Sequence, residues 1–329
     1  MSNDVWVVAE HFQGRLNDVT FELLGKGREL ATGLGGKVVV ALLGSKVSGL
    51  VGELGAADVI FTADRPELRE FAADAYGAVL EAGLKEVQPR LVLMGSTSVG
   101  LDLLSLLSAR LTFPCIDSCT RIEVEDARIV ATSQIYGGKL FAEVALADAT
   151  TLVAVVPGMF PLEAGKVSGK PEVKSLAVPG ELPGARIIFR KLIEPPPGDV
   201  DLTKVPILVA VGRGFQNAGN VPQAEELAQV LGGAVCGSRP VIDQGWLAKT
   251  RQVGKSGSSV KPKLYLALGI SGAPEHVEGM RGSELTVAIN TDPQAPIFSV
   301  AHYGAVADLF DILPVLTEEI KKRQESRAA

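Results

Sequence analysis

The chain has 329 residues, of which 47% are hydrophobic, and its formal net charge is −6. This length suits about two domains, and the acidic balance argues against nucleic-acid binding. The longest apolar runs, such as residues 37–44, have strand length, so we expect no direct membrane insertion. Three cysteines are an odd count for a secreted disulfide scaffold, and their spacing suits no metal site. With no signal or transit segment in view, we expect a cytoplasmic protein without a metal.

The first half alternates strand-like and helix-like segments. The strands are expected at residues 5–10, 37–44, 58–64 and 90–97. The helices are expected at 17–34, between 44 and 58, at 66–87 and at 100–111. This alternation predicts right-handed βαβ units on a parallel sheet. From residue 114 the rhythm changes, and the stretches 115–126, 128–146 and 150–157 predict an antiparallel addition to the same domain.

A proline- and glycine-rich stretch separates this half from a second α/β unit. Strands are expected at 205–212, 234–239, 263–271 and 284–290. Helices are expected at 220–233, 273–280 and 305–322, with a frayed tail after them. We therefore predict an α/β fold in two domains. An N-terminal βαβ domain with a parallel sheet and antiparallel additions covers 1–186, and a C-terminal doubly wound domain covers 204–329. Residues 187–203 form the connector, in which prolines 195–198 predict a stiff hinge.

The expected strands of the second domain end in residues suited to a ligand. Arg213 follows the first strand and Arg239 the second, while Ser271 and Asn290 end the third and fourth. Ligands of open parallel sheets bind beyond the carboxyl ends of the strands. Fixed positive charge, neutral hydrogen-bonding groups and glycines together indicate a pocket for a large anionic nucleotide. The plainer alternative is that these glycines only form tight turns.

The triplet Gly254-Lys255-Ser256 has the letters of a phosphate-binding P-loop. That motif needs a glycine at position 249, where this chain has Lys249. It also needs a buried strand before it and a helix after it, and the surrounding residues favour neither. The sequence context therefore argues against a nucleoside triphosphatase.

Several longer strings share one order and spacing. They are QVGKSG (252–257), ALGISGAPEH (267–276), AINTDPQAPIF (288–298) and YGAVADLF (303–310), with GRGFQNAGN and GSRPVIDQGW upstream. In order, spacing and residue type they resemble the FAD-binding domain of the electron-transferring flavoprotein alpha subunit. The resemblance continues more weakly through the first domain, for example in GSTSVGLDLLSLLSARL and SQIYGG, and so covers nearly the whole chain.

The resemblance implies FAD as the cofactor and a set of residues that bind it. That set is Arg213, Ser238, Arg239, Gln252, Val253, Gly254, Lys255, Ser256, Gly257, Ser271, Gly272, Ala273, Pro274, Glu275, His276, Asn290, Asp308 and Leu309.

Individual roles follow from the same resemblance. Ser256 would hydrogen-bond near the redox nitrogen of the flavin, and His276 would lie by the pyrimidine carbonyl. Arg239 would sit over the flavin ring, the alternative being a salt bridge to a carboxylate. Asp308 would bind the adenine-side half of FAD.

Lys255 and Glu275 stand where the family usually has glutamines. They could pair with one another across the flavin-binding loops, or tune the potential of the flavin in opposite senses. These two departures bear on the redox potential and the electron partner more than on FAD binding.

The resemblance also implies an electron carrier rather than an enzyme. Such a carrier pairs with a beta subunit, takes electrons from a donor such as an acyl-CoA dehydrogenase of fatty acid beta-oxidation, and passes them to a quinone oxidoreductase or similar acceptor. Some members of the family work in electron-bifurcating complexes. Two alternatives stay open at this point: a nucleotide-dependent α/β oxidoreductase or NTPase, and a homo-oligomeric binding module with no redox role.

Overall fold

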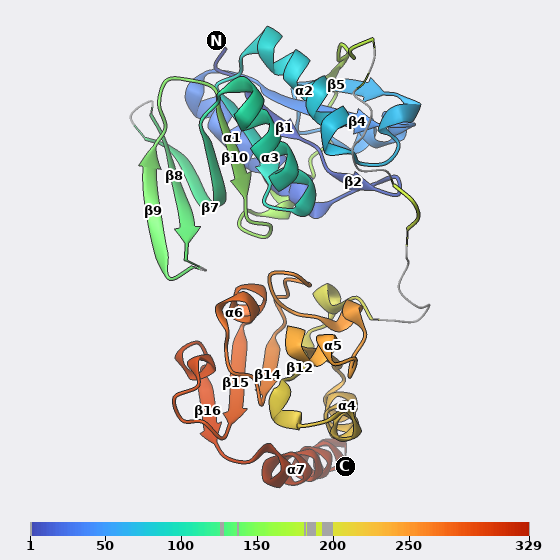
Figure 1. Ribbon diagram of the computed structural model, residues 1–329, viewed down its shortest axis with the longest axis vertical. Helices are drawn as coiled ribbons and strands as arrows, with labels where there is room; N and C mark the ends of the chain where they lie inside the picture. The colour runs from blue at the N-terminus through green and yellow to red at the C-terminus, as the bar shows by residue number, and fades with distance from the viewer. Residues whose placement is uncertain are drawn as a thin grey trace. The chain divides into compact units, whose positions relative to one another are not determined.

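The computed structural model describes residues 2–125, 128–136, 138–180, 182, 189–192 and 200–328. The chain divides into two compact units, residues 1–191 and 192–329, and each unit has its own large sheet (Figure 1). The predicted hinge at 195–198 and about half of the predicted connector lie outside the described residues, so the domain limits at 186 and 204 stay a prediction. In the described part of the chain, no helix is long and apolar enough to cross a bilayer.

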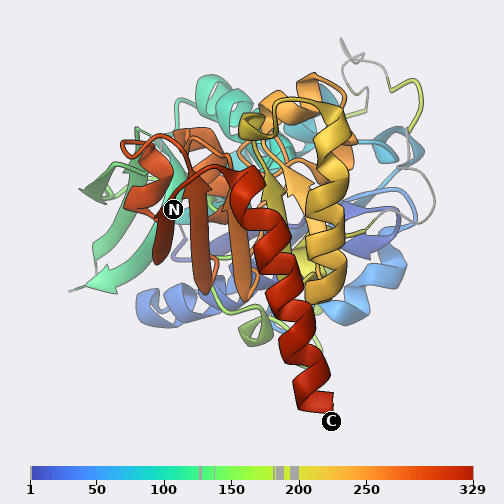
Figure 2. The same ribbon diagram turned by 90° about the horizontal axis from the view of Figure 1, so that it is seen from below.

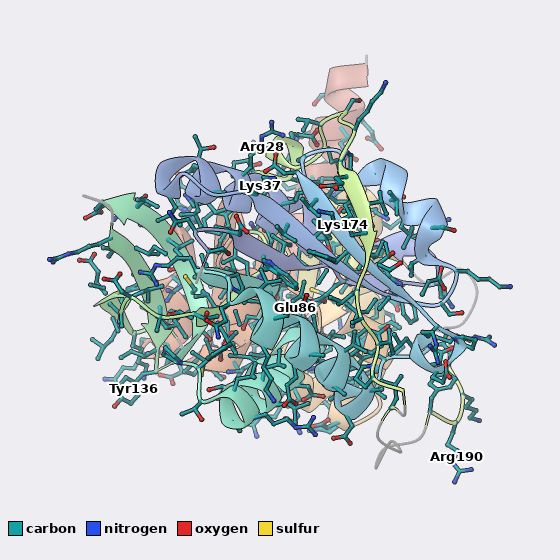
Figure 3. All side chains as sticks on the ribbon, turned by 90° about the horizontal axis from the view of Figure 1, so that it is seen from above. Arg28, Lys37, Glu86, Tyr136, Lys174 and Arg190 are labelled. Atoms are coloured by element: carbon teal, nitrogen blue, oxygen red, sulfur yellow. The ribbon has the colours of Figure 1, made fainter. Side chains whose placement is uncertain are left out.

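The first unit is built on a nine-stranded mixed sheet. In spatial order its strands are β11 (Glu172–Ser175), β5 (Val59–Asp64), β4 (Val38–Gly44), β1 (Val5–Val8), β6 (Leu91–Gly95), β10 (Thr151–Val155), β7 (Cys115–Glu125), β8 (Arg128–Ile135) and β9 (Leu140–Ala145). Neighbours are parallel from β11 to β7 and antiparallel from β7 to β9. Figure 3 labels Lys174 on the β11 edge and Tyr136 beside the antiparallel arm. A short hairpin joins β2 (His11–Phe12) to β3 (Arg15–Leu16).

Helices cover both faces of the parallel part of this sheet. Helix α1 (Asp18–Leu34) packs on one face, and α2 (Ala73–Val87) and α3 (Ser98–Leu111) pack on the other. Strand β1 shows the alternation, since Val5 and Val7 join the core under α1 while Trp6 joins the core under α2 and α3. The predicted βαβ domain with antiparallel additions is confirmed. Its parallel strands could be predicted because a strand buried on both faces has a continuous apolar sequence.

Four details of the first unit differ from the prediction. The expected helix at 66–87 is split into a 3-10 turn, Pro66–Leu68, and α2. The backbone of Ala72 is extended between them, and the hydroxyl of Tyr76 donates a hydrogen bond to the carbonyl of Leu68 at 2.9 Å. The segment between β4 and β5 is a 3-10 helix, Val47–Glu53. Strand β10 is not part of the antiparallel arm, since it lies between β6 and β7 and is parallel to both. Exposed strand β11 has no apolar pattern, so it was not predicted.

The second unit is a doubly wound five-stranded sheet, as predicted. Its strands in spatial order are β13 (Ala234–Gly237), β12 (Ile207–Val211), β14 (Leu264–Leu268), β15 (Leu285–Asn290) and β16 (Tyr303–Val306), all parallel. Helices α4 (Val221–Leu231) and α7 (Leu309–Ala328) lie side by side on one face (Figure 2). Helix α6 (Pro274–Met280) packs on the other face together with the segment around Val253 and Val260. A short helix, α5 (Arg239–Asp243), follows β13.

Short 3-10 turns complete both units. They are Leu162–Ala164 in the first, and Leu202–Lys204, Arg213–Phe215, Ala218–Asn220, Lys249–Arg251 and Pro296–Ser299 in the second.

The carboxyl end of the second unit corrects one prediction. Residues 303–306, part of which was expected in the last helix, form β16, which pairs in parallel register with β15. Helix α7 begins only at Leu309 and continues to Ala328, past the expected end at 322. Asp308 starts this helix by accepting a hydrogen bond from the amide of Phe310 at 2.9 Å, and such a carboxylate cap favours a helix beginning at this point.

Candidate cofactor-binding site

A large cavity opens at the carboxyl edge of the second sheet. The chain passes from β12 to β13 on one side and then crosses to β14 on the other, so the loops after β12 and β14 diverge. Such a switch point leaves a crevice for a ligand. The cavity has a volume of about 810 Å³ and is lined by residues that follow each strand, among them Arg213, Ser238, Ser271 and Asn290. Small-molecule sites commonly have ~300–1,000 Å³.

The structure brings nearly all of the predicted site residues to this one cavity. The exceptions are Gly257, Gly272 and Pro274. The amide of Gly257 closes the neighbouring turn by donating to the carbonyl of Gly254 at 2.8 Å. Gly272, at φ +87°, packs against the backbone of Ile297, and Pro274 is the first residue of α6. These three shape the walls rather than line the space.

Several lining residues were not predicted from the sequence. They are Gln216, Pro240, Ala295, Pro296 and Ala307. Ala307 reaches the cavity because it follows β16, whose last two residues were expected in the C-terminal helix. Gln216 adopts φ +65°, a left-handed backbone conformation that cannot be predicted from a glutamine in the sequence. Had β16 been predicted, the residues after its carboxyl end would have been assigned to the site together with those after the other four strands.

The loop from Gln252 to Ser258 is held in shape by its own hydrogen bonds. The amide of Ser258 donates to the carbonyl of Gln252 at 2.8 Å, and the side-chain amide of Gln252 donates to the hydroxyl of Ser256 at 2.7 Å. Lys249 in turn donates to the Gln252 side chain at 2.6 Å. Gly254 adopts φ +133°, which a residue with a side chain rarely adopts. Gln252 and Val253 are buried, whereas Lys255 and Ser256 are exposed toward the cavity.

This loop is not a P-loop. A 3-10 turn, Lys249–Arg251, precedes it where a buried strand is required, and no helix begins between Gly257 and Pro274 in this fully described stretch. The amide of Lys255 donates to the carbonyl of Glu275 at 2.7 Å, so it is not left for a phosphate. The geometry therefore rejects a P-loop NTPase.

Three cationic side chains line the cavity: Arg213, Arg239 and Lys255. Arg239 forms an ion pair with Asp243 at 3.3 Å, which is the alternative that the sequence left open. Both partners are more than half exposed, so the pair contributes only ~0–1 kcal/mol and leaves the guanidinium available to a ligand. The suggested ion pair between the side chains of Lys255 and Glu275 is not formed among the described residues. The two residues are joined instead by the backbone hydrogen bond from the Lys255 amide to the Glu275 carbonyl.

The polar side chains at the strand ends are partly committed to the protein. Asn290 donates to the carbonyl of Ile270 at 2.9 Å and accepts from the amide of Asp292 at 3.0 Å, so it ties β15 to the loop after β14. Asp308 caps α7. Ser238 is buried at the start of α5 and makes no capping bond with its side chain. Its hydroxyl is therefore the better placed of these groups for a ligand.

His276 is the buried polar group of the site. The side chain is 6% exposed, and its Nε2 lies 2.9 Å from the hydroxyl of Tyr265, which is fully buried in β14. Nδ1 is also buried and makes no hydrogen bond in the described part of the chain. Burial lowers the pKa of His276 to about 4, so the ring is neutral at pH 7. A buried nitrogen without a partner costs ~1–3 kcal/mol, which a ligand acceptor or donor would recover.

These features place the second unit among the doubly wound domains that bind nucleotide cofactors at a switch point. Profile comparison then identifies the family. The electron transfer flavoprotein domain matches residues 5–180, and the electron transfer flavoprotein FAD-binding domain matches residues 201–281.

Relatives match along nearly the whole chain. Protein FixB of Clostridium saccharobutylicum is 39% identical over 97% of this chain and 96% of its own length. The electron transfer flavoprotein subunit alpha of Bacillus subtilis is 36% identical over 98% of each chain. The lactate dehydrogenase (NAD(+),ferredoxin) subunit LctC of Acetobacterium woodii is 34% identical over 98% of this chain and 78% of its own.

The chain therefore belongs to the electron transfer flavoprotein alpha-subunit family, and its second unit is an FAD-binding domain. The residues at the cavity fit this cofactor. The unpaired Nδ1 of His276 needs a ligand group, and Arg213, Arg239 and Lys255 supply positive charge for an anionic dinucleotide.

Proposed function

We propose that this chain is the alpha subunit of a heterodimeric electron carrier. In this proposal its FAD accepts electrons from a flavoprotein dehydrogenase and passes them to a quinone oxidoreductase or a related acceptor. The observation that carries the proposal is the cavity at the carboxyl edge of the second sheet, with three cations and one buried, unpaired imidazole nitrogen on its walls. When bound, FAD supplies the electron-transfer chemistry.

The chain's own residues would bind and polarise the cofactor. Arg213 is suited to its phosphates, because it is cationic and exposed toward the cavity, whereas Lys255 adds positive charge beside Ser256 at the flavin end. The Arg239 guanidinium would lie over the flavin, where a positive charge favours the electron-rich reduced form. Ser256 would hydrogen-bond the redox-active edge, and its hydroxyl is already oriented by Gln252. Asp308, at the far end of β16, would face the adenine half.

Electron carriage is favoured over catalysis on a substrate because several polar side chains are already engaged in structural hydrogen bonds. Glu10 of the first unit is buried and bonded to Thr97, and Asn290 and Asp308 of the second unit are committed to loop and cap hydrogen bonds. His276 is neutral at pH 7, because burial lowers its pKa to about 4, so it is suited to hydrogen bonding rather than to proton transfer near pH 7.

The electron partners form the finer part of the proposal. By family resemblance the proposed donor is an acyl-CoA dehydrogenase, and we further propose a cytoplasmic location. A complex with NAD and ferredoxin is the second candidate, because the relative LctC is named as a subunit of a lactate dehydrogenase that uses both. Reduction of the purified carrier by an acyl-CoA dehydrogenase with its substrate, or by NADH with ferredoxin present, distinguishes the two.

The test of the carrier itself is gentle isolation of the chain co-expressed with a beta subunit. A stable heterodimer with flavin absorbance, releasing about one FAD per alpha chain on denaturation and reduced by a dehydrogenase, supports the proposal. A homo-oligomer that recovers no beta subunit and takes up no FAD would refute it, and would favour the binding-module alternative.

A further inference from the structure

The ring of His276 links the cavity to the core of the sheet. On the core side its Nε2 meets the hydroxyl of Tyr265 at 2.9 Å, and the sulfur of Cys236 lies 3.9 Å from the same hydroxyl. The two rings are tilted by 55° with centroids 6.1 Å apart, which suits an edge-on hydrogen bond rather than a stack. Tyr265, Cys236 and His276 thus form a buried chain of three groups from β13 through β14 to α6.

The hydrogens in this chain have one favourable arrangement. A neutral imidazole has one nitrogen that donates and one that accepts. Burial raises the pKa of Tyr265 well above its usual value and that of Cys236 to about 12, so both keep their protons. If Tyr265 donates to Nε2, its proton makes a bond at 2.9 Å and the thiol of Cys236 donates weakly to the tyrosine oxygen.

The reverse arrangement is poorer. If Nε2 donates, the hydroxyl hydrogen of Tyr265 is left with the sulfur at 3.9 Å, which is a weak acceptor at a long distance. Nδ1 has no partner among the described residues in either arrangement, so the bond to Tyr265 decides between the two.

We propose that Tyr265 is a positioning residue, which holds the Nε2 of His276 as an acceptor and so makes Nδ1–H the hydrogen-bond donor that His276 offers to a carbonyl oxygen of the cofactor. The inference rests on the proposed FAD site. It names the donor atom, the tautomer and the residue that selects them. The hydrogen bond between Tyr265 and His276 is made within the protein itself. The tautomer is therefore set before the cofactor arrives, and no reorganisation of the imidazole is needed on binding.

The tautomer can be measured directly, because the chain contains only three histidines. Nitrogen NMR of the histidine-labelled chain, paired with its beta subunit and prepared with and without FAD, separates protonated from unprotonated ring nitrogens, and H276Q assigns the signals. We expect a protonated Nδ1 and an unprotonated Nε2 in both preparations. A protonated Nε2 in the wild-type protein would overturn the proposal, whether or not FAD is bound.

The variant Y265F removes one hydroxyl and keeps the shape of the core. It should lower the Nδ1–H population and weaken FAD binding by about 2- to 10-fold, the range expected for one lost hydrogen bond. The matched control is Y303F, which removes the hydroxyl of the exposed Tyr303 in the same sheet and should change neither readout. An unchanged tautomer in Y265F would contradict the proposal. Loss of FAD from the wild-type complex would instead count against the carrier function, since the tautomer is measured independently.

Discussion

The sharpest prediction concerns Gly279, where α6 touches the flavin loop backbone to backbone. A Cβ placed on Gly279 would lie 2.5 Å from both the nitrogen and the Cα of Gly254. The carbonyl of Gly279 accepts from the amide of Val260 at 2.8 Å, and Glu275, one turn earlier, accepts from Lys255 at 2.7 Å. The loop is therefore clamped on the helix, and neither partner has a flexible side chain that could move aside.

The variant G279A separates this contact from helix propensity. In an ordinary helix interior, alanine in place of glycine stabilises by ~1 kcal/mol. Here a methyl group needs roughly 1 Å more space, which overpacked cores accommodate at a cost of ~1–3 kcal/mol. The displaced loop carries Gly254, Lys255 and Ser256, all of which line the cavity. We expect a lower free energy of unfolding and FAD binding weakened by about 10-fold or more.

The assay compares wild type and G279A as co-expressed heterodimers. FAD affinity is measured by flavin fluorescence, and unfolding in urea is followed through Trp246, which packs on the core of the second unit. The control is G52A in the first unit, because a Cβ there meets nothing within 4 Å. If G279A bound FAD within about twofold of wild type and unfolded at the same urea concentration, the clamp would not exist as described.

Three further predictions follow from single side chains. Because burial lowers the pKa of His276 to about 4, the unfolded chain binds this proton more tightly, and about 3 kcal/mol of stability should be lost as the pH falls from 6.5 to 4. H276Q should flatten that slope in urea unfolding, and an unchanged slope would refute the assignment. K255Q should lower the midpoint potential of the flavin, since it removes a cation from the cavity wall; an unchanged spectroelectrochemical titration would exclude this. Glu10 accepts a hydrogen bond from the hydroxyl of Thr97 at 2.8 Å, and burial raises the pKa of the Glu10 carboxyl. The folded protein therefore loses the stability that a protonated Glu10 contributes as the pH rises through that raised pKa. E10Q, which stays neutral, should therefore gain stability relative to wild type as the pH rises from 4 to 7, and a constant difference in thermal denaturation would contradict the burial argument.

Elements with a strong apolar pattern were predictable from the sequence. Strands such as Val38–Gly44 and Leu91–Gly95 are buried on both faces, so nearly every residue is apolar and the run ends at a glycine. The long motifs of the second unit were equally informative, because the residues that end its strands are the ones that a ligand must meet. Most of the cavity wall could be named for that reason.

Pairing partners and short elements were decided by the tertiary structure. Strand β11, with the sequence EVKS, is exposed and has no pattern of its own, and it exists because the edge of β5 offers it backbone hydrogen bonds. Strand β10 was expected with the antiparallel strands because it follows them in the chain, but its continuous apolar sequence is buried on both faces, and it lies between β6 and β7 in parallel register with both. Residues 305–306 were expected at the start of the last helix, and they instead form the end of β16 through pairing with β15.

The site divides in the same way. Residue type and order along the chain indicated a glycine-rich, cationic edge suited to an anionic nucleotide, because those properties belong to each residue wherever it folds. The family resemblance of the longer motifs then implied that this nucleotide is FAD. Which nitrogen of His276 is free, that Lys255 and Glu275 meet through their backbones, and that Tyr265 stands behind the imidazole were decided only by the tertiary structure. Hydrogen bonds and desolvation depend on distances of a few ångströms between residues from different elements, and no local pattern in the sequence encodes those distances.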